Sequence, residues 1–430
     1  MKKQILLFTF LFTAGFLSAQ TDFQLISVGA GYNLQSFVDI SAGTENQSPN
    51  DAWDIAFNVG PGSAGVLINE SGGSSMGQGL PTIELYDTGS DDFSMTPDPV
   101  VFEESQLHNL EQSWSSGAFN EVADPADPFD FGWGSYDVTN HTVSGSHVYV
   151  LKLRSGDYLK VQVQTLQSGT FTFRYANLDG SNEETKTIVK ADHAGNALAY
   201  FSFASGSTVD IEPAGGFDLS YLRYKALLED GGDPIHYPVT GILSGPGVEV
   251  VQADGVDPET VDFETYESEL SAELDIIGHD WKDFDLGTFS WVLPADRAYF
   301  VKTADNNIWK IWFLDFEGSS TGTATIEKED LGMLSAVVDE NAPLESIDVF
   351  PNPVRTQAQL VFSIKNTFNN QVNLQISDSF GRLLSQTELQ GVVQGLNSFN
   401  LPVDELASGM YYVTLIVDNQ PFTERIVIFD

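Results

Sequence analysis

Histidine, methionine and carboxylate side chains supply the chemistry open to this 430-residue chain, because it contains no cysteine. A neutral imidazole nitrogen is a good axial ligand for iron. The six histidines are His108, His141, His147, His193, His236 and His279. The missing cysteine excludes disulfides, thiolate metal sites and cysteine nucleophiles.

Acidic turns are a second source of chemistry. Four segments combine Asp or Glu with Gly or Pro: 87–92, 124–130, 229–234 and 253–259. Such turns can supply the oxygen ligands that calcium prefers, but none has the EF-hand spacing. Because Asp, Gly and Pro are also the usual residues of exposed turns, we expect ordinary loops, with calcium sites as the alternative.

Phosphate-loop and zinc-protease motifs are missing from the sequence. No GK[ST] follows the glycine-containing stretch 60–65, and H-E-x-x-H does not occur. We therefore expect a protein without enzymatic activity. A carboxylate pair for glycoside hydrolysis stays open among the 61 acidic residues.

The charge balance narrows the range of partners. The 61 acidic and 19 basic side chains give a net charge of −42. A polyanion repels phosphate backbones and anionic lipid surfaces, so we expect no nucleic-acid partner. The 38 Gly and 30 Phe residues favour β structure, and no long segment has the apolar spacing of a helix. The composition therefore predicts an all-β fold.

The N-terminus has the pattern of a secretory signal peptide over residues 1–19. Lys2 and Lys3 precede an apolar run that ends at Leu17, and small residues before Gln20 suit cleavage. The apolar run is too short to span a bilayer comfortably, so we expect no transmembrane segment. Without cysteine, the exported chain also lacks the acceptor for a lipoprotein anchor.

Four blocks of the sequence recur in the same order further along the chain. Blocks 37–43, 52–58, 128–136 and 148–166 align with 200–206, 216–222, 283–291 and 298–316. Such self-similarity predicts two tandem copies, residues 21–190 and 191–335. In each copy the last block has turn residues between alternating apolar runs, which is the pattern of a β-hairpin.

The stretch "AWDIAFN" places an acid, Asp54, inside an apolar run. Strand alternation puts Trp53, Ile55 and Phe57 on one face and Asp54 on the other. The second copy repeats the acid as Asp218. Because Asp often accepts hydrogen bonds from nearby backbone N–H groups, we predict a structural role for Asp54.

Two motifs of the first copy are informative together: a "WDIAF" strand after a D-x-x-x-G segment, and a later "YVLK…G-x-Y-x-K" hairpin. Their combination resembles the HmuY family of Bacteroidota surface proteins. The second copy resembles a diverged relative, with "GFDLSYL" and "YFVKTADNNIWKI". The resemblance covers about residues 21–335 and implies an all-β fold built from two HmuY-like modules. It also implies haem bound in a cleft, through two histidines in some members and two methionines in others.

On that resemblance, the haem ligands should lie between the "WDIAF" strand and the hairpin. His108 and His141 lie in that region, and we predict them as the axial pair. Ordinary loop histidines are the competing interpretation. The other candidates left open are His147, Met76, Met95, His236 and His279.

The C-terminal segment, 346–430, contains "FPNPV", "SFGRLL" and "ASGMYYV" in that order. The series resembles the type IX secretion C-terminal sorting domain. The matched positions are Pro351, Asn352, Pro353, Gly381, Arg382, Gly409 and Tyr411. About seven short alternating strands follow the prolines, which is the pattern of an immunoglobulin-like β-sandwich. The resemblance implies translocation by the type IX machinery, then release or attachment at the cell surface.

Tryptophans of the second copy suggest a competing function. Trp281, Trp291, Trp309 and Trp312 could form a stacking platform for sugars, although large aromatics more often pack in β cores. We therefore predict a secreted or surface-attached ligand-binding protein, with haem capture as the first function. The alternative is adhesion, or binding of an extracellular glycan or protein without haem.

Overall fold

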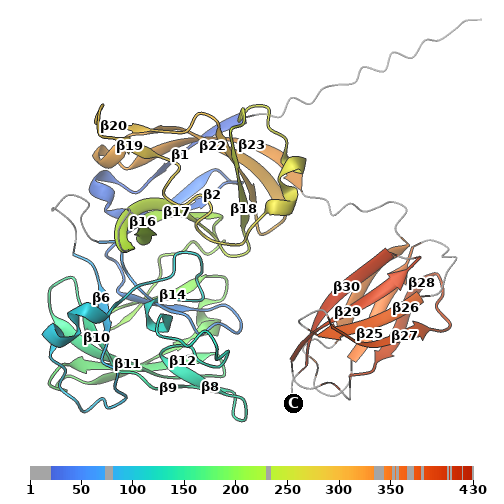
Figure 1. The fold of residues 1–430 in the computed structure, drawn as a ribbon, viewed down its shortest axis with the longest axis horizontal. Helices are drawn as coiled ribbons and strands as arrows, with labels where there is room; N and C mark the ends of the chain where they lie inside the picture. The colour runs from blue at the N-terminus through green and yellow to red at the C-terminus, as the bar shows by residue number, and fades with distance from the viewer. Residues whose placement is uncertain are drawn as a thin grey trace, which may run out of the picture. The chain divides into compact units, whose positions relative to one another are not determined.

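The structure is a computed structural model with two compact units, Met1–Leu334 and Ser335–Asp430. It describes residues 21–428 apart from 73–80, 229–233, 334–342, 351–353, 355–357, 366–371, 379–381, 404–405, 407–408 and 419. Strands dominate both units, and the helical segments described are short 3-10 turns (Figure 1). The predicted all-β fold is confirmed.

The first lobe of unit 1 consists of two sheets. The larger has the order β13-β12-β11-β10-β6-β7, with the hairpin β8–β9 attached to β11, and the smaller has the order β15-β14-β4-β5. The strands of the larger sheet are β6 (Glu84–Asp87), β7 (Gln106–Leu107), β8 (Gly134–Asp137), β9 (Thr142–Gly145), β10 (Tyr149–Lys152), β11 (Tyr158–Gln167), β12 (Thr170–Asn177) and β13 (Glu184–Val189). Those of the smaller are β4 (Ile55–Asn58), β5 (Val66–Ile68), β14 (Leu198–Ser202) and β15 (Ser207–Val209). Their facing side chains, such as Phe57, Trp133 and Phe171, form one buried core.

The second lobe of unit 1 repeats this plan. One sheet has the order β1-β23-β22-β21-β18, the other has the order β17-β16-β2-β3, and β19 pairs with β20. The strands are β1 (Thr21–Ser27), β2 (Leu34–Asp39), β3 (Thr44–Pro49), β16 (Leu219–Leu228), β17 (Ile235–Ser244), β18 (Glu249–Asp254), β19 (Asp283–Asp285), β20 (Ser290–Val292), β21 (Arg297–Lys302), β22 (Asn307–Phe316) and β23 (Thr323–Met333). Tyr221, Trp281 and Tyr299 lie at the centre of its core.

Strands of the two predicted copies are exchanged between the lobes. The hairpin β2–β3, from the first copy, pairs with β16 of the second, with Val38 opposite Leu219. The hairpin β14–β15, from the second copy, pairs with β4 of the first, with Tyr200 opposite Ala56. β1 likewise pairs along its length with β23. The first lobe is therefore continuous from β4 to β15, whereas the second combines β1–β3 with β16–β23.

Unit 2 is a β-sandwich of a three-stranded sheet, β24-β25-β28, and a four-stranded sheet, β27-β26-β29-β30. Its strands are β24 (Leu344–Phe350), β25 (Ala358–Ile364), β26 (Val372–Asp378), β27 (Leu383–Leu389), β28 (Gly395–Leu401), β29 (Gly409–Val417) and β30 (Gln420–Ile428). Gly409 begins β29, and Tyr411 belongs to the buried core between the sheets. Seven strands in two sheets agree with the predicted sandwich. One of them, β24, comes before the prolines that were expected to precede all the strands.

Several sequence predictions concern residues that the structure does not describe. These are the signal peptide at 1–19, Met76, and the sorting-motif residues Pro351, Asn352, Pro353 and Gly381. Within the described part of the chain, no helix combines the length and the apolar character needed to cross a membrane.

Candidate functional site

His108, the first predicted haem ligand, follows β7 and contacts a buried carboxylate. Its Nδ1 lies 2.7 Å from Oε1 of Glu70, whose side chain is only 2 % exposed. Glu70 also accepts the backbone N–H of Asn109 at 3.0 Å, and Lys225 Nζ lies 3.8 Å from it. The backbone N–H of His108 donates to the Glu121 carboxylate. His108 is thus held by acidic partners from two directions.

The ring of His108 stacks on that of His236, which comes from β17 in the other lobe. The ring centroids are 3.8 Å apart and the planes differ by 19°. Burial, followed by the nearby charge of His108, lowers the pKa of His236. Axial ligands must approach an iron from opposite faces of the macrocycle, so these two stacked rings would have to separate to act as a pair.

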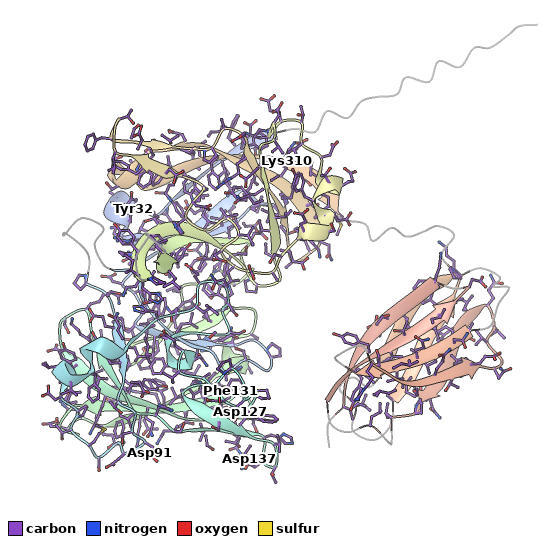
Figure 2. The ribbon with its side chains drawn as sticks, viewed as in Figure 1. Tyr32, Asp91, Asp127, Phe131, Asp137 and Lys310 are labelled. Atoms are coloured by element: carbon purple, nitrogen blue, oxygen red, sulfur yellow. The ribbon has the colours of Figure 1, made fainter. Side chains whose placement is uncertain are left out.

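His141, the second predicted ligand, lies in the turn between β8 and β9. Its backbone is left-handed, with φ of 54°, and its Nδ1 is 2.8 Å from the Tyr136 hydroxyl. Figure 2 labels Asp137, the last residue of β8, on this hairpin of the first lobe. His108 and His141 have separate sets of partners, Glu70 for the first and Tyr136 for the second. Their joint role as haem ligands stays a prediction.

The other candidate ligands also have separate surroundings. His147 Nδ1 lies 3.1 Å from Asp87, and this hydrogen bond raises the pKa of His147. Burial lowers the pKa of His279. The backbone carbonyl of Met95 accepts a hydrogen bond from Lys160. Among the residues that the structure describes, no group of three or more His, Asp and Glu is placed to hold a metal ion.

A cleft of about 500 Å³ lies between the lobes. Residues from both lobes line it, including Asn58, Gln112, Trp114, Asn196 and Lys302. The indole N–H of Trp114, from the first lobe, donates to the Ser244 carbonyl of the second at 3.1 Å. The volume is in the range of small-molecule sites, and the lining combines amide, hydroxyl and charged side chains with apolar carbon.

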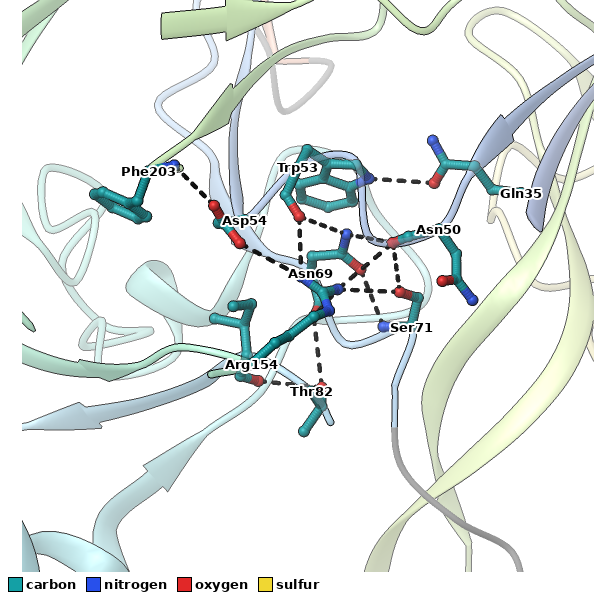
Figure 3. A network of polar contacts seen from close by, with 10 residues as sticks. Gln35, Asn50, Trp53, Asp54, Asn69, Ser71, Thr82, Arg154 and Phe203 are labelled. Atoms are coloured by element: carbon teal, nitrogen blue, oxygen red, sulfur yellow. Dashed lines mark hydrogen bonds and ion pairs between the residues drawn. The ribbon is translucent and has the colours of Figure 1, made fainter. Parts of the chain in front are cut away.

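Asp54 and Arg154 form the centre of a polar network in the first lobe (Figure 3). Asp54 Oδ2 accepts the backbone N–H of Phe203 at 2.8 Å, which ties β4 to the exchanged hairpin β14–β15. Arg154 Nη1 lies 3.4 Å from Asp54 Oδ1 and donates to the Trp53 carbonyl at 3.1 Å. The predicted role of Asp54 as an acceptor of backbone hydrogen bonds agrees with this geometry.

One detail of that prediction was wrong. Ile55 and Phe57 lie in the main core, but Trp53 packs in a separate cluster with Ala56 and Phe217. β4 begins only at Ile55, so the alternation does not reach Trp53. All four residues of β4 are buried. The exchanged hairpin pairs along one edge of the strand, and side chains of the second lobe, such as Phe217, pack on the face opposite the main core.

Asp218 repeats the role of Asp54 in the second lobe. Its Oδ2 accepts the backbone N–H of Ile40 at 2.8 Å, which ties β16 to the hairpin β2–β3. Burial, together with the charges of Asp39 and Asp305, raises the pKa of Asp218 to about 6. Asp54, from the first copy, therefore anchors a hairpin of the second copy. Asp218, from the second copy, anchors a hairpin of the first copy.

The tryptophans considered as a stacking platform are mostly in the core. Trp281 and Trp309 belong to the core of the second lobe, and Trp291 packs partly buried against that core. Trp312 is also buried, but outside this cluster. Lys282, which the sequence did not single out, lies 4.1 Å above the Trp281 ring, and burial lowers its pKa to about 7. The prediction that these aromatics pack in a core agrees with the structure.

Comparison with known proteins supports both resemblances in part. Residues 31–175 match the family model of the HmuY protein. This segment contains β2–β3, which pair with β16 outside it. Residues 348–429 match the model of a secretion system C-terminal sorting domain, which indicates secretion and surface attachment. The match covers unit 2 almost completely.

Neither of the remaining comparisons adds to these matches. No curated protein matches the chain. One solved structure that does is PorZ, described as an essential bacterial surface component of the type-IX secretion system of Porphyromonas gingivalis. It shares 10 % identity, and the alignment covers 69 % of this chain and 41 % of PorZ with a TM-score of 0.15. That score is too low to support a structural argument.

Proposed function

We propose that this chain is an exported, non-enzymatic binding protein that captures a ligand at the cell surface. The match of residues 31–175 to the HmuY protein carries the proposal, and the sorting-domain match supports the location. The cleft of about 500 Å³ between the lobes offers a binding volume of suitable size.

Haem is the first ligand to test, with His108 and His141 as its axial ligands. The HmuY match includes both residues. A haem titration followed by absorbance should give a low-spin, six-coordinate spectrum. His108→Ala and His141→Ala should each convert it to a five-coordinate or high-spin spectrum, whereas the control His193→Ala should not. Unchanged spectra in both variants would eliminate this pair, and the absence of any Soret shift would eliminate haem.

A polar extracellular ligand, such as a glycan, is the second candidate. The residues that line the cleft include amides and Trp114 but no histidine or methionine, and such a lining suits hydroxyl groups and sugar faces better than iron. A glycan array should then identify a ligand whose affinity falls in Asn196→Ala. The control is Thr187→Ala on the exposed edge strand β13. Equal affinity in both variants would place binding elsewhere.

The sorting domain should be needed for delivery and not for folding of unit 1. The two units have separate cores, as expected for independent domains. Residues 21–335 expressed in a foreign periplasm should be soluble and folded by circular dichroism. Insoluble or unfolded protein would contradict this independence.

A further inference from the structure

The turns of hairpins β10–β11 and β21–β22 have the same backbone hydrogen bonds but different side chains. In the first, Leu153 N–H donates to the Asp157 carbonyl at 2.8 Å, and in the second, Thr303 N–H donates to the Asn307 carbonyl at 2.9 Å. A second bond closes each turn in the same way, from Gly156 to Leu153 and from Asn306 to Thr303. The residue after Leu153 is Arg154, and the residue after Thr303 is Ala304.

Arg154 fills the space beside Asp54 in the first lobe. Besides its ion pair, its guanidinium donates to the carbonyl of Asn69 at 3.4 Å and to the hydroxyl of Ser71 at 3.2 Å (Figure 3). The side chain is only 17 % exposed. The first lobe thus surrounds a guanidinium with one carboxylate and several neutral oxygens, which matches the five donors of that group.

The second lobe has a cavity of about 380 Å³ beside Asp218, where Ala304 stands in place of arginine. The backbone around it follows the first lobe: Gly245 N–H donates to the Asp218 carbonyl as Asn69 N–H donates to that of Asp54. The lining residues that can accept hydrogen bonds through their side chains are Asp39, Ser41, Asp218 and Asp305. Replacing the arginine by alanine has therefore left an acidic cavity next to the repeated carboxylate.

The charge in this cavity is only partly balanced. Burial and the charges of Asp39 and Asp305 raise the pKa of Asp218, which shows that its negative charge is disfavoured there. Lys328 is the nearby cation, and its ammonium donates to the Ile40 carbonyl and lies 5.1 Å from the centre of the Trp309 ring. These carboxylates are not grouped so as to hold a metal ion. A flat cation with several donors suits separated acceptors better than a spherical ion.

We propose that the cavity lined by Asp39, Asp218, Ala304 and Asp305 binds a guanidinium group from outside the chain. The group replaces, in the second lobe, the side chain that Arg154 supplies in the first. It belongs to a free arginine-like molecule or to an arginine side chain of a partner, and both present the same chemistry. The site goes beyond the proposed function and does not depend on the ligand of the cleft, although Pro246 lines both.

Calorimetric titration of the whole chain with N-acetyl-arginine amide tests the site. N-acetyl-citrulline amide, which has nearly the same shape but no charge, should bind at least about tenfold more weakly, because hydrogen bonds to charged groups are the stronger ones. Affinity should fall from pH 7.5 to pH 5, because protonation of Asp218 removes its charge. Free arginine and a short peptide with an internal arginine then distinguish the two sources: the source that binds more tightly is the one the site accepts.

Two reciprocal variants connect binding to the cavity. Ala304→Arg supplies the guanidinium from within the chain and should abolish binding, while Arg154→Ala opens the equivalent space and should raise the stoichiometry from one site to two. Equal affinities for the arginine and citrulline amides, or unchanged binding in Ala304→Arg, would overturn the proposal. If Arg154→Ala fails to fold, the Ala304→Arg result still decides. Haem and glycan titrations of Ala304→Arg should match the unaltered chain, which separates this site from the proposed function.

Discussion

The two lobes of unit 1 have matching strand orders, but they differ in whether a cation pairs with the same buried aspartate. Each places an aspartate where a core strand meets the exchanged hairpin, and each aspartate accepts a backbone N–H of that hairpin at 2.8 Å. In the first lobe Arg154 balances the acid, whereas in the second Ala304 leaves it beside Asp39 and Asp305. The fold therefore needs the carboxylate as an acceptor, but it does not need the arginine.

The lobes also differ in how the chain builds them. The first uses consecutive strands from β4 to β15, and the second combines the N-terminal strands β1–β3 with β16–β23. A pair of sequence copies need not correspond to a pair of folding units, because hairpins of equal shape can pair with either copy.

The largest effect should come from cutting the chain at different boundaries. Residues 50–212 contain every strand of the first lobe, together with Glu212, whose carboxylate accepts the Ala197 N–H at 2.7 Å. This fragment should fold cooperatively. Residues 21–190 keep β1–β3 without their partners and lose β14–β15, which cover β4, so this fragment should not fold. Circular dichroism and thermal melting of both fragments measure the difference, and the reverse outcome would contradict the exchange.

Removing the arginine from the first lobe should have the next largest effect. Arg154→Ala leaves the mostly buried Asp54 carboxylate without its cation and breaks several hydrogen bonds, which costs about 2–3 kcal/mol. Ala304→Arg should stabilise the second lobe by about 1 kcal/mol, because ordering a long side chain offsets part of the gain. Denaturant unfolding of both variants gives the values. Destabilisation of similar size by both changes would show that the space beside Asp218 cannot accept an arginine as the space beside Asp54 does.

Asp218→Asn should change how stability depends on pH. The pKa of Asp218 in the folded protein, about 6, is above the ordinary value of 3.8. The stability it contributes is therefore present below about pH 4 and is lost as the pH rises through 6. We therefore compare the free energy of unfolding of Asp218→Asn with that of the unaltered chain at each pH. The difference should favour the variant more at pH 7.5 than at pH 4. Unfolding free energies at the two pH values test this, and a difference that does not vary with pH would refute it.

The smallest effect concerns the stacked histidines between the lobes. Burial lowers the pKa of His236 below its ordinary value of 6.5, so its contribution to stability is present above that pH and is lost as the pH falls. His108, Glu70 and Lys225 are the charged groups that face it. His236→Gln should reduce the loss of stability between pH 7 and pH 5. His193→Gln, outside the cluster, serves as the control and should leave the pH profile unchanged.

Much of the fold could be predicted from local patterns. Alternation along residues 159–163 and turn residues at Ser155–Asp157 predict the hairpin β10–β11 correctly, because both signals depend only on neighbouring residues. The exchange could not be predicted, because β2–β3 would satisfy the same pattern paired with either β4 or β16. Trp53 was also placed on the wrong face. β4 begins only at Ile55, and the residue at which a strand begins depends on the strands that pair with it, which the local pattern does not show.

The site was less predictable than the fold. His236 was only a weak candidate and Glu70 was not singled out, because their contact with His108 joins residues far apart in the sequence. The alignment of the two copies did pair Arg154 with Ala304, at the same offset that pairs Lys152 with Lys302. That difference acquires meaning only when the structure shows what Arg154 touches. His108 and His141 share a sequence region, but the sequence gives no sign of their separate partners, Glu70 and Tyr136.

Disulfide trapping tests the strand exchange most directly, because the natural chain contains no cysteine. Leu25 lies opposite Thr325 in the pairing of β1 with β23, and both positions are accessible. If each copy kept its own strands, residue 25 would instead pair with Thr172 in β12, the counterpart of Thr325. On mild oxidation, the double variant Leu25→Cys/Thr325→Cys should form an intramolecular disulfide, detected by mass spectrometry of the digested protein, and Leu25→Cys/Thr172→Cys should not. Efficient cross-linking of residue 25 to residue 172, with none to residue 325, would contradict the exchange.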